Sequence, residues 1–448
     1  MRLQFGLTSY ERAKGDLPEL PVVNMFAEEA PSEETGVALQ SRYGLTDQSA
    51  DIGTSVKAIF QRDRVLSGAQ FAVSSGALYS GVTNLGAIDG SGAASIAGLE
   101  TDIFVTQGAS LYTYEGATLS AVSFPDAANV TKVVAGASRA IALRADGGKF
   151  YWTPALGNTF AALDFATAES QPDGVLDALF IDDVLVLFGS ETVEFWPNTG
   201  NSDLPFQPLE GRVFERGIRA TGCATIMGAT FYWVGDDNAL YTNGNEPTRI
   251  SNAGLEEAIS GSTACSLFTF TLEGTEFLAL RLDTETHVYS SRSRMFSRFE
   301  SYGQTNWLPT CYASGIFGAS DGKQLAWSTD HLDVGGQLER RWRAGMAING
   351  GGVQVSNVQL RTNPGQTSYL AGQYADPTIE MRVSRNAGQS WKNWKSRSLG
   401  AQGEYRKKVQ WRGCGQASQP GFLCEFRTTD PVPLRISDVR INEPYGGR

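Results

Sequence analysis

The sequence predicts an all-β protein, a β-propeller of six or seven blades followed by a C-terminal β-sandwich. A turn and a short strand ending in an aromatic residue recur seven times, in phrases that contain Tyr79, Tyr112, Tyr151, Phe195, Tyr241, Tyr289 and Trp327. The steps between these aromatics, 33 to 48 residues, are typical of propeller blades. The 50 glycines suit frequent tight turns. The i, i+3, i+4 apolar spacing of helical repeats is missing.

A change in charge near Glu339 divides the chain. Residues 1–338 carry 20 Lys+Arg against 40 Asp+Glu, whereas residues 339–448 carry 17 against 8. We therefore expect a propeller over residues 51–338 and a sandwich of about 100 residues over 339–448. Residues 1–50 should supply an N-terminal arm or strand, because three prolines interrupt regular pairing there.

The C-terminal region alternates as a half-buried sheet does. Ile379–Ser384 places apolar and polar residues on opposite faces. Tyr405–Arg412 is predicted to be one strand, with Tyr405, Val409 and Trp411 on its buried face. The exposed side chains of this strand and the arginines that open the domain form a candidate basic contact surface, which consists of Arg340, Arg341, Arg343, Arg406, Lys408 and Arg412. It could bind DNA or an acidic protein surface, or be merely solvated.

A loop over residues 198–208 is longer than a hairpin needs. Its candidate contact residues are Asn198, Asn201, Asp203 and Phe206. One interpretation is an interaction loop that reaches a neighbouring subunit or a partner protein. The other is a connection between blades, closed by Phe206 packing against the propeller. The sequence does not decide between them.

Catalytic, metal and cofactor signatures are missing from the sequence. The two histidines, His287 and His331, have no nucleophile motif nearby. The five cysteines form no Cys-x-x-Cys pair, which argues against zinc and against a disulfide framework and favours a reducing cytoplasm. No apolar run reaches the length of a membrane helix, so we expect no membrane insertion. The sequence predicts neither catalytic residues nor a metal or cofactor site.

One segment, Ser384–Trp391, fits the Asp-box pattern of sialidase-like propellers, with Asn386 in the Asp position. A single copy outside the propeller predicts a structural hairpin in which Gly388 takes a positive φ. Two alternatives stay open: a propeller glycosidase, and a carbohydrate-binding adhesin with Trp391, Trp394 and Trp411 as stacking platforms. An odd offset at strand spacing would place Trp391 and Trp394 on opposite faces.

Several segments resemble one family in its own order along the chain. They are Val23–Glu28, Val193–Phe206, Glu215–Gly217, Phe231–Asp237, Pro247–Ser251, Ser384–Trp391, Ser398–Gly400, Gly403–Tyr405 and Val409–Trp411. These segments are similar to the tail hub, or nozzle, proteins of short-tailed bacteriophages, also called packaged DNA stabilisation proteins. A departure is Tyr43, where the family leads us to expect a proline.

The resemblance implies a structural virion protein and not an enzyme. In this family a homo-hexameric ring extends the tail channel below the portal and the adaptor protein. The ring retains packaged double-stranded DNA, lets it pass at ejection without tight binding, and contacts tail fibres or spikes. It would be made in the bacterial host cytoplasm and end in the virion tail. The acidic propeller is consistent with such a conduit, because carboxylates directed toward the lumen repel phosphate.

Overall fold

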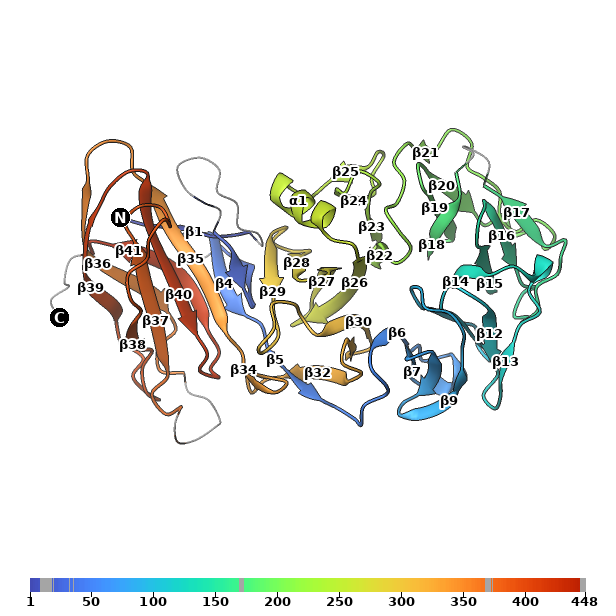
Figure 1. Ribbon diagram of the computed structural model, residues 1–448, viewed down its shortest axis with the longest axis horizontal. Helices are drawn as coiled ribbons and strands as arrows, with labels where there is room; N and C mark the ends of the chain where they lie inside the picture. The colour runs from blue at the N-terminus through green and yellow to red at the C-terminus, as the bar shows by residue number, and fades with distance from the viewer. Residues whose placement is uncertain are drawn as a thin grey trace.

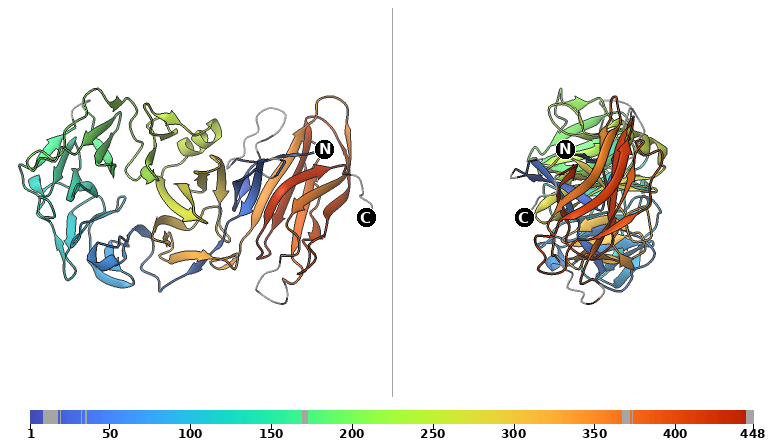
Figure 2. Two further views of the ribbon diagram at one scale, coloured as in Figure 1. Left: turned by 180° about the vertical axis from the view of Figure 1, so that it is seen from behind. Right: turned by 90° about the vertical axis from the view of Figure 1, so that its left-hand side faces the viewer.

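The computed structural model describes residues 1–8, 18, 20–31, 33–34, 36–168, 173–366, 372 and 374–443. A propeller and a sandwich lie end to end along the long axis of the molecule (Figures 1 and 2). Met1 and Glu443, the first and last described residues, both lie at the sandwich, where they bond Ile441 and Asn357. Within the described residues the helical segments are one α-helix, α1 (Ala253–Gly261), and two 3-10 turns, Leu66–Gly68 and Pro125–Ala127. The all-β fold class is confirmed.

Seven blades make up the propeller in the described part of the chain, each a four-stranded antiparallel arrangement. Blade 1 contains β6 (Val56–Phe60), β7 (Phe71–Ser74), β8 (Ala77–Ser80) and β9 (Thr83–Ala87). Blade 2 contains β10 (Ser95–Gly98), β11 (Ile103–Thr106), β12 (Leu111–Tyr114) and β13 (Leu119–Ala121). Blade 3 contains β14 (Val130–Gly136), β15 (Arg139–Arg144), β16 (Lys149–Trp152) and β17 (Phe165–Thr167). Blade 4 contains β18 (Val175–Ile181), β19 (Val184–Gly189), β20 (Val193–Pro197) and β21 (Val213–Phe214). Blade 5 contains β22 (Ala224–Met227), β23 (Thr230–Val234), β24 (Leu240–Thr242) and β25 (Thr248–Arg249).

The last two blades connect the propeller to other parts of the chain. Blade 6 contains β26 (Cys265–Leu272), β27 (Thr275–Leu282), β28 (Thr286–Ser290) and β29 (Phe296–Phe299). Blade 7 contains β30 (Pro309–Ala313), β31 (Ile316–Ala319) and β32 (Gln324–Ser328), and takes its outer strand, β5 (Gly44–Asp47), from the beginning of the chain. The ring of blades is therefore closed by a strand that is remote in sequence.

The recurring aromatic phrases correspond to the blades one for one. Each of the seven aromatics lies in the third strand of its blade, from Tyr79 in β8 to Trp327 in β32. The turns that precede or follow these hairpin strands use residues that tolerate positive φ. Ser75 and Gly76, for example, have φ values of 50° and 71° in the turn between β7 and β8. The local turn chemistry thus fixes the blade repeat.

The sandwich consists of two packed sheets. One contains β35 (Arg340–Ala347), β40 (Gly421–Thr428), β37 (Thr378–Ser384) and β38 (Lys395–Ser398), with β1 (Gln4–Phe5) beside β35. The other contains β3 (Met25–Ala30), β4 (Gly36–Ser41), β41 (Arg435–Ile441), β36 (Val353–Thr362) and β39 (Val409–Ala417). The hairpin of β33 (Leu332–Asp333) and β34 (Gly336–Gln337) lies between blade 7 and β35 in the chain.

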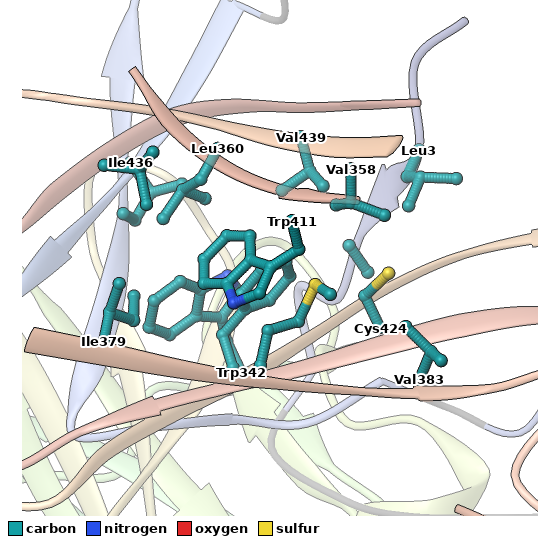
Figure 3. Packing of buried hydrophobic residues seen from close by; sticks show 14 of the residues in the cluster. Leu3, Trp342, Val358, Leu360, Ile379, Val383, Trp411, Cys424, Ile436 and Val439 are labelled. Atoms are coloured by element: carbon teal, nitrogen blue, oxygen red, sulfur yellow. The ribbon is translucent and has the colours of Figure 1, made fainter. Parts of the chain in front are cut away.

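The sandwich core is aromatic at its centre (Figure 3). Trp342 stacks on Phe426 with ring centroids 5.2 Å apart, and Trp411 meets Phe426 edge-on at 5.6 Å. Side chains from the start of the chain, including Leu3 and Leu39, complete this core. The N-terminal residues are therefore an integral part of the sandwich.

A short N-terminal strand, β2 (Val22–Val23), joins the two domains by backbone pairing. Val23 pairs in parallel with Arg298 of β29, and it pairs antiparallel with Arg341 of β35. Blade 6 and the first sandwich sheet consequently form one continuous ten-stranded sheet. Hydrogen bonds, and not only a covalent linker, fix the propeller to the sandwich.

Two buried polar side chains strengthen this junction. Asn24, which has a positive φ of 56°, donates from Nδ2 to the Glu339 carbonyl at 2.8 Å, and its Oδ1 accepts from Arg42 Nε at 2.9 Å. The Arg42 guanidinium also donates to the Glu300 carbonyl at 2.8 Å and to Asp333 Oδ2 at 3.2 Å. The Arg42 and Asp333 side chains are both 0 % exposed. We call Asn24, Arg42 and Asp333 the junction cluster.

Replacing Arg42 by Met should lower the free energy of unfolding by about 3–5 kcal/mol, because it leaves the buried Asp333 carboxylate without its cation. Denaturant titration followed by tryptophan fluorescence measures this change. The matched control, Arg64→Met at an exposed arginine, should stay within about 0.5 kcal/mol of the wild type. Equal stability of the Arg42 and Arg64 variants would show that the junction cluster does not hold the domains together.

Candidate interaction surfaces

The loop between β20 and β21 is built around a buried aromatic. Phe206 is 0 % exposed and packs edge-on against Trp152 and Phe180, with ring centroids 6.2 and 6.3 Å away. These partners belong to blades 3 and 4. The loop joins two strands of blade 4, so the expected connection between blades is wrong, although Phe206 packs against the propeller as that interpretation expected. Phe206 is therefore not available as a contact side chain.

The remainder of the loop projects from the propeller in a defined shape. The Thr199 amide donates to the Pro205 carbonyl at 2.8 Å, and Thr199 Oγ1 donates to the Leu204 carbonyl at 2.7 Å. Asn201 Oδ1 accepts from the Asp203 amide at 2.9 Å. Asn201, Asp203 and Leu204 are exposed, and Asn198 is half-buried beside Asp183. The interaction role of this outer part stays a prediction.

The residues of the candidate basic contact surface lie in different environments in the structure: some are buried or paired with carboxylates, and others are exposed. Arg340 is 0 % exposed, and its guanidinium donates to the carbonyls of Val432 and Asp430. Its inclusion in a contact surface is therefore wrong: the strand alternation of β35 directs it inward, where backbone carbonyls satisfy it. Arg341 and Arg343 are partly exposed, but they pair with Glu339 and Glu425 at 3.0 and 2.9 Å.

The second half of that surface is exposed but is not a strand ladder. β39 begins at Val409, so Arg406 and Lys408 lie in the preceding turns, and only Arg412 belongs to the strand. The predicted strand over 405–412 was wrong at its start because Gly403, with φ of 91°, initiates turns there. Tyr405 is correspondingly 66 % exposed and not buried. Arg406, Lys408 and Arg412 are all exposed.

An unforeseen ladder of stacked cations and indoles covers the outer face of the first sandwich sheet. The Arg382 guanidinium lies over both Trp391 and Trp394, 4.7 and 4.6 Å from the ring centroids. Arg343 adds to Trp391 at 5.3 Å and Arg427 to Trp394 at 4.2 Å. Strand geometry had predicted opposite faces for the two indoles, but residues 391–394 are not a strand. The signal available in the sequence was an arginine at an outward position between buried residues in each of three strands: Arg343 in β35, Arg382 in β37 and Arg427 in β40.

The Asp-box segment forms the turn before this ladder. Asn386 Oδ1 accepts from the Ser390 amide at 3.0 Å, Ser384 Oγ accepts from the Gly388 amide at 2.8 Å, and Gly388 has φ of 91°. Trp411 lies in the core with 0 % exposure, so it cannot serve as a stacking platform. Arginines already occupy positions over the other two indoles, which weakens the adhesin alternative.

In the part of the chain that the structure describes, the histidines and carboxylates form no recognisable reaction centre. His287 is buried in β28 with Nε2 3.1 Å from Glu285. His331 packs edge-on against Tyr43, and burial, aided by the charge of Arg340, lowers the pKa of His331 to about 4. Among the described residues no group of three His, Cys, Asp or Glu could hold a metal ion. A search of the same residues finds no helix long and apolar enough to cross a membrane.

The central channel of the propeller contains a cavity of about 660 Å³. It is lined mainly by the beginnings of the innermost strands and by neighbouring loops, and three of its side chains are cationic: Lys57, Lys132 and Arg281. Lys132 pairs with the buried Asp177 at 2.7 Å. This cluster is basic although residues 1–338 are strongly acidic in sum, so the net charge of the region does not describe its channel.

Comparisons with known proteins cover both domains. The family described as "Bacteriophage P22 Gp10, beta-propeller" matches residues 1–341, and "Bacteriophage P22 Gp10, beta-sandwich" matches residues 341–443. The tail hub protein gp10 of Salmonella phage P22 is 23 % identical over 416 residues, covering 83 % of this chain and 85 % of that protein.

Solved propeller structures show much weaker likeness. YCF48 from Cyanidioschyzon merolae is 12 % identical with a TM-score of 0.43, covering 64 % of this chain and 100 % of that one. BamB from Moraxella catarrhalis is 12 % identical with a TM-score of 0.35, covering 63 % and 97 %. No functional argument rests on either. The matches to both domains confirm the resemblance found in the sequence, and the chain belongs to the bacteriophage P22 Gp10 family of tail hub proteins.

Proposed function

We propose that this protein forms the nozzle ring of a short-tailed phage: a homo-hexamer that retains packaged double-stranded DNA, conducts it at ejection, and docks the adaptor and the tail fibres or spikes. The observation that carries this proposal is the match of both domains to one tail hub family in a single chain. The continuous sheet through β2 supports it, because a conduit under load needs domains that do not move independently.

The charge distribution supports a conduit with little affinity for DNA. Tight binding of duplex DNA requires Lys and Arg at many phosphates. Residues 1–338 carry twice as many acidic as basic residues. We propose that propeller carboxylates face the lumen of the ring and that DNA slides past them. The cationic side chains of the propeller's own channel belong to a different, smaller space.

We propose a purely structural role and no enzymatic one. The buried positions of His287 and His331 support this, because neither can reach a substrate as a general base. The Asp-box turn is explained by its local hydrogen bonds alone. Release of sugar from host capsule or lipopolysaccharide by the purified protein would contradict the proposal.

Electron microscopy of the purified full chain should show rings with six-fold symmetry, whether alone or after addition of the adaptor. If the exposed basic side chains contact an acidic propeller in the neighbouring subunit, the rings should dissociate as salt rises. Charge reversal at Arg406, Lys408 and Arg412 should then weaken assembly, whereas Arg64→Glu should not. Monomers under all conditions, adaptor included, would refute the ring, and salt-independent rings would refute the charged contact.

The outer loop offers a separate test of partner docking. Deleting residues 200–204 should leave a folded monomer, because Thr199 and Pro205 remain close enough to rejoin, yet it should reduce ring assembly or infectivity. The contrasting variant is Phe206→Ala, which should lower the free energy of unfolding by about 3–5 kcal/mol through the cavity it leaves. Normal assembly and infectivity of the deletion variant would refute the interaction role.

A further inference from the structure

The basic cavity in the propeller channel contains an arginine, Arg281, that has no protein partner among the described residues. Arg281 lies near the end of β27, the second strand of blade 6, directly across from Ser266 of β26, and both residues line the cavity. Within the described part of the chain, the Arg281 guanidinium makes no ion pair or side-chain hydrogen bond that accounts for its charge. Burial alone lowers the pKa of Arg281, with no carboxylate to offset it.

Two carboxylates lie at the cavity, Asp283 in its lining and Asp177 beside Lys132, and each is bonded to groups other than Arg281. Asp283 accepts from the Thr263 amide at 2.6 Å, from the Thr263 hydroxyl at 2.8 Å and from the Ala264 amide at 3.0 Å. Asp177 accepts from the Gly222 amide at 2.7 Å and pairs with Lys132. Neither carboxylate neutralises Arg281, and the exposed Lys57 adds a second cation to the lining.

The rest of the lining suits an oxyanion ligand. Hydroxyl groups in the lining come from Ser91 before blade 2, Ser266 in blade 6 and Ser320 in blade 7. The Thr310 hydroxyl in the same lining already donates to the Val56 carbonyl at 2.6 Å. An arginine fork combined with hydroxyl donors is the arrangement that proteins use for phosphate groups. The volume of about 660 Å³ falls within the range of roughly 300–1,000 Å³ of small-molecule sites. The surrounding small side chains, such as Gly92, Ala93 and Gly222, leave the space open.

We propose that the central channel of the propeller binds a small phosphate-bearing anion through Arg281, with Lys57 and the channel hydroxyls as further donors. Arg281 is partly buried, and a partly buried cation without a protein partner is stabilised by a ligand that neutralises it. The bound anion would therefore stabilise the ring of blades from its centre. This proposal goes beyond the nozzle role and does not depend on it, since the site lies within one subunit.

The test is titration calorimetry of the full-length protein with pyrophosphate, inorganic phosphate and adenosine triphosphate at constant ionic strength. At least one should bind, and it should raise the melting temperature in proportion to the logarithm of its concentration well above Kd. Arg281→Met should weaken that binding at least roughly tenfold, as loss of a charged hydrogen-bonding partner does. Arg64→Met is the matched control and should bind as the wild type does.

The melting temperature of the Arg281→Met variant without anion is a second measurement, which distinguishes an anion-binding role of Arg281 from a structural one. Without phosphate, Arg281→Met should melt at the same temperature as the wild type or higher, because it removes an uncompensated cation. A lower melting temperature would show that Arg281 is a structural residue and overturn the proposal. So would binding unchanged by Arg281→Met, absence of heat with all three anions, or binding only of an acidic peptide or an oligonucleotide.

Discussion

The pairing of β2 with both β29 and β35 is the constraint on which the rest of the structure depends. Through it, blade 6 and the first sandwich sheet become one sheet. The junction cluster begins directly after β2. Its Asn24 and Arg42 side chains form hydrogen bonds with backbone groups of Glu300, at the end of blade 6, and Asn24 also bonds the Glu339 carbonyl, just before β35. The same segment continues to β3 and β4 in the sandwich and to β5 in blade 7. The described strands of this segment, β1 to β5, thus connect the two domains by backbone pairing.

This arrangement has a mechanical consequence for a tail hub protein. Two domains connected only by a linker would move independently. Here, separating them requires breaking backbone hydrogen bonds and exposing the Arg42–Asp333 pair. The two proposed interaction surfaces, the outer loop in the propeller and the exposed basic residues in the sandwich, are therefore held at a fixed separation. Subunits with such rigid spacing suit a closed ring, whose geometry must be the same in every copy.

Local chemistry was predictable from the sequence, and long-range pairing was not. The seven aromatic phrases predicted one strand in each blade, which the structure shows to be the third, because turn residues and strand alternation are local signals. The two-residue strand Val22–Val23 carries no such signal, and its partners lie hundreds of residues away. Arg340 was misplaced because its charge suggested exposure, whereas backbone carbonyls satisfy it internally. The Arg382 ladder was missed because residues 391–394 were judged by strand geometry. Arg281 appeared in none of the sequence patterns, since its isolation is a property of the assembled channel.

Hydrogen exchange at the junction tests the central claim most directly. Amides of residues 22–25, measured by mass spectrometry of overlapping peptides, report whether β2 opens independently of the domains it joins. If β2 fixes the propeller to the sandwich, these amides should exchange as slowly as those of β29 and β35, through the same opening event. Exchange of residues 22–25 at the rate of a free chain end, while β29 and β35 stay protected, would contradict the account.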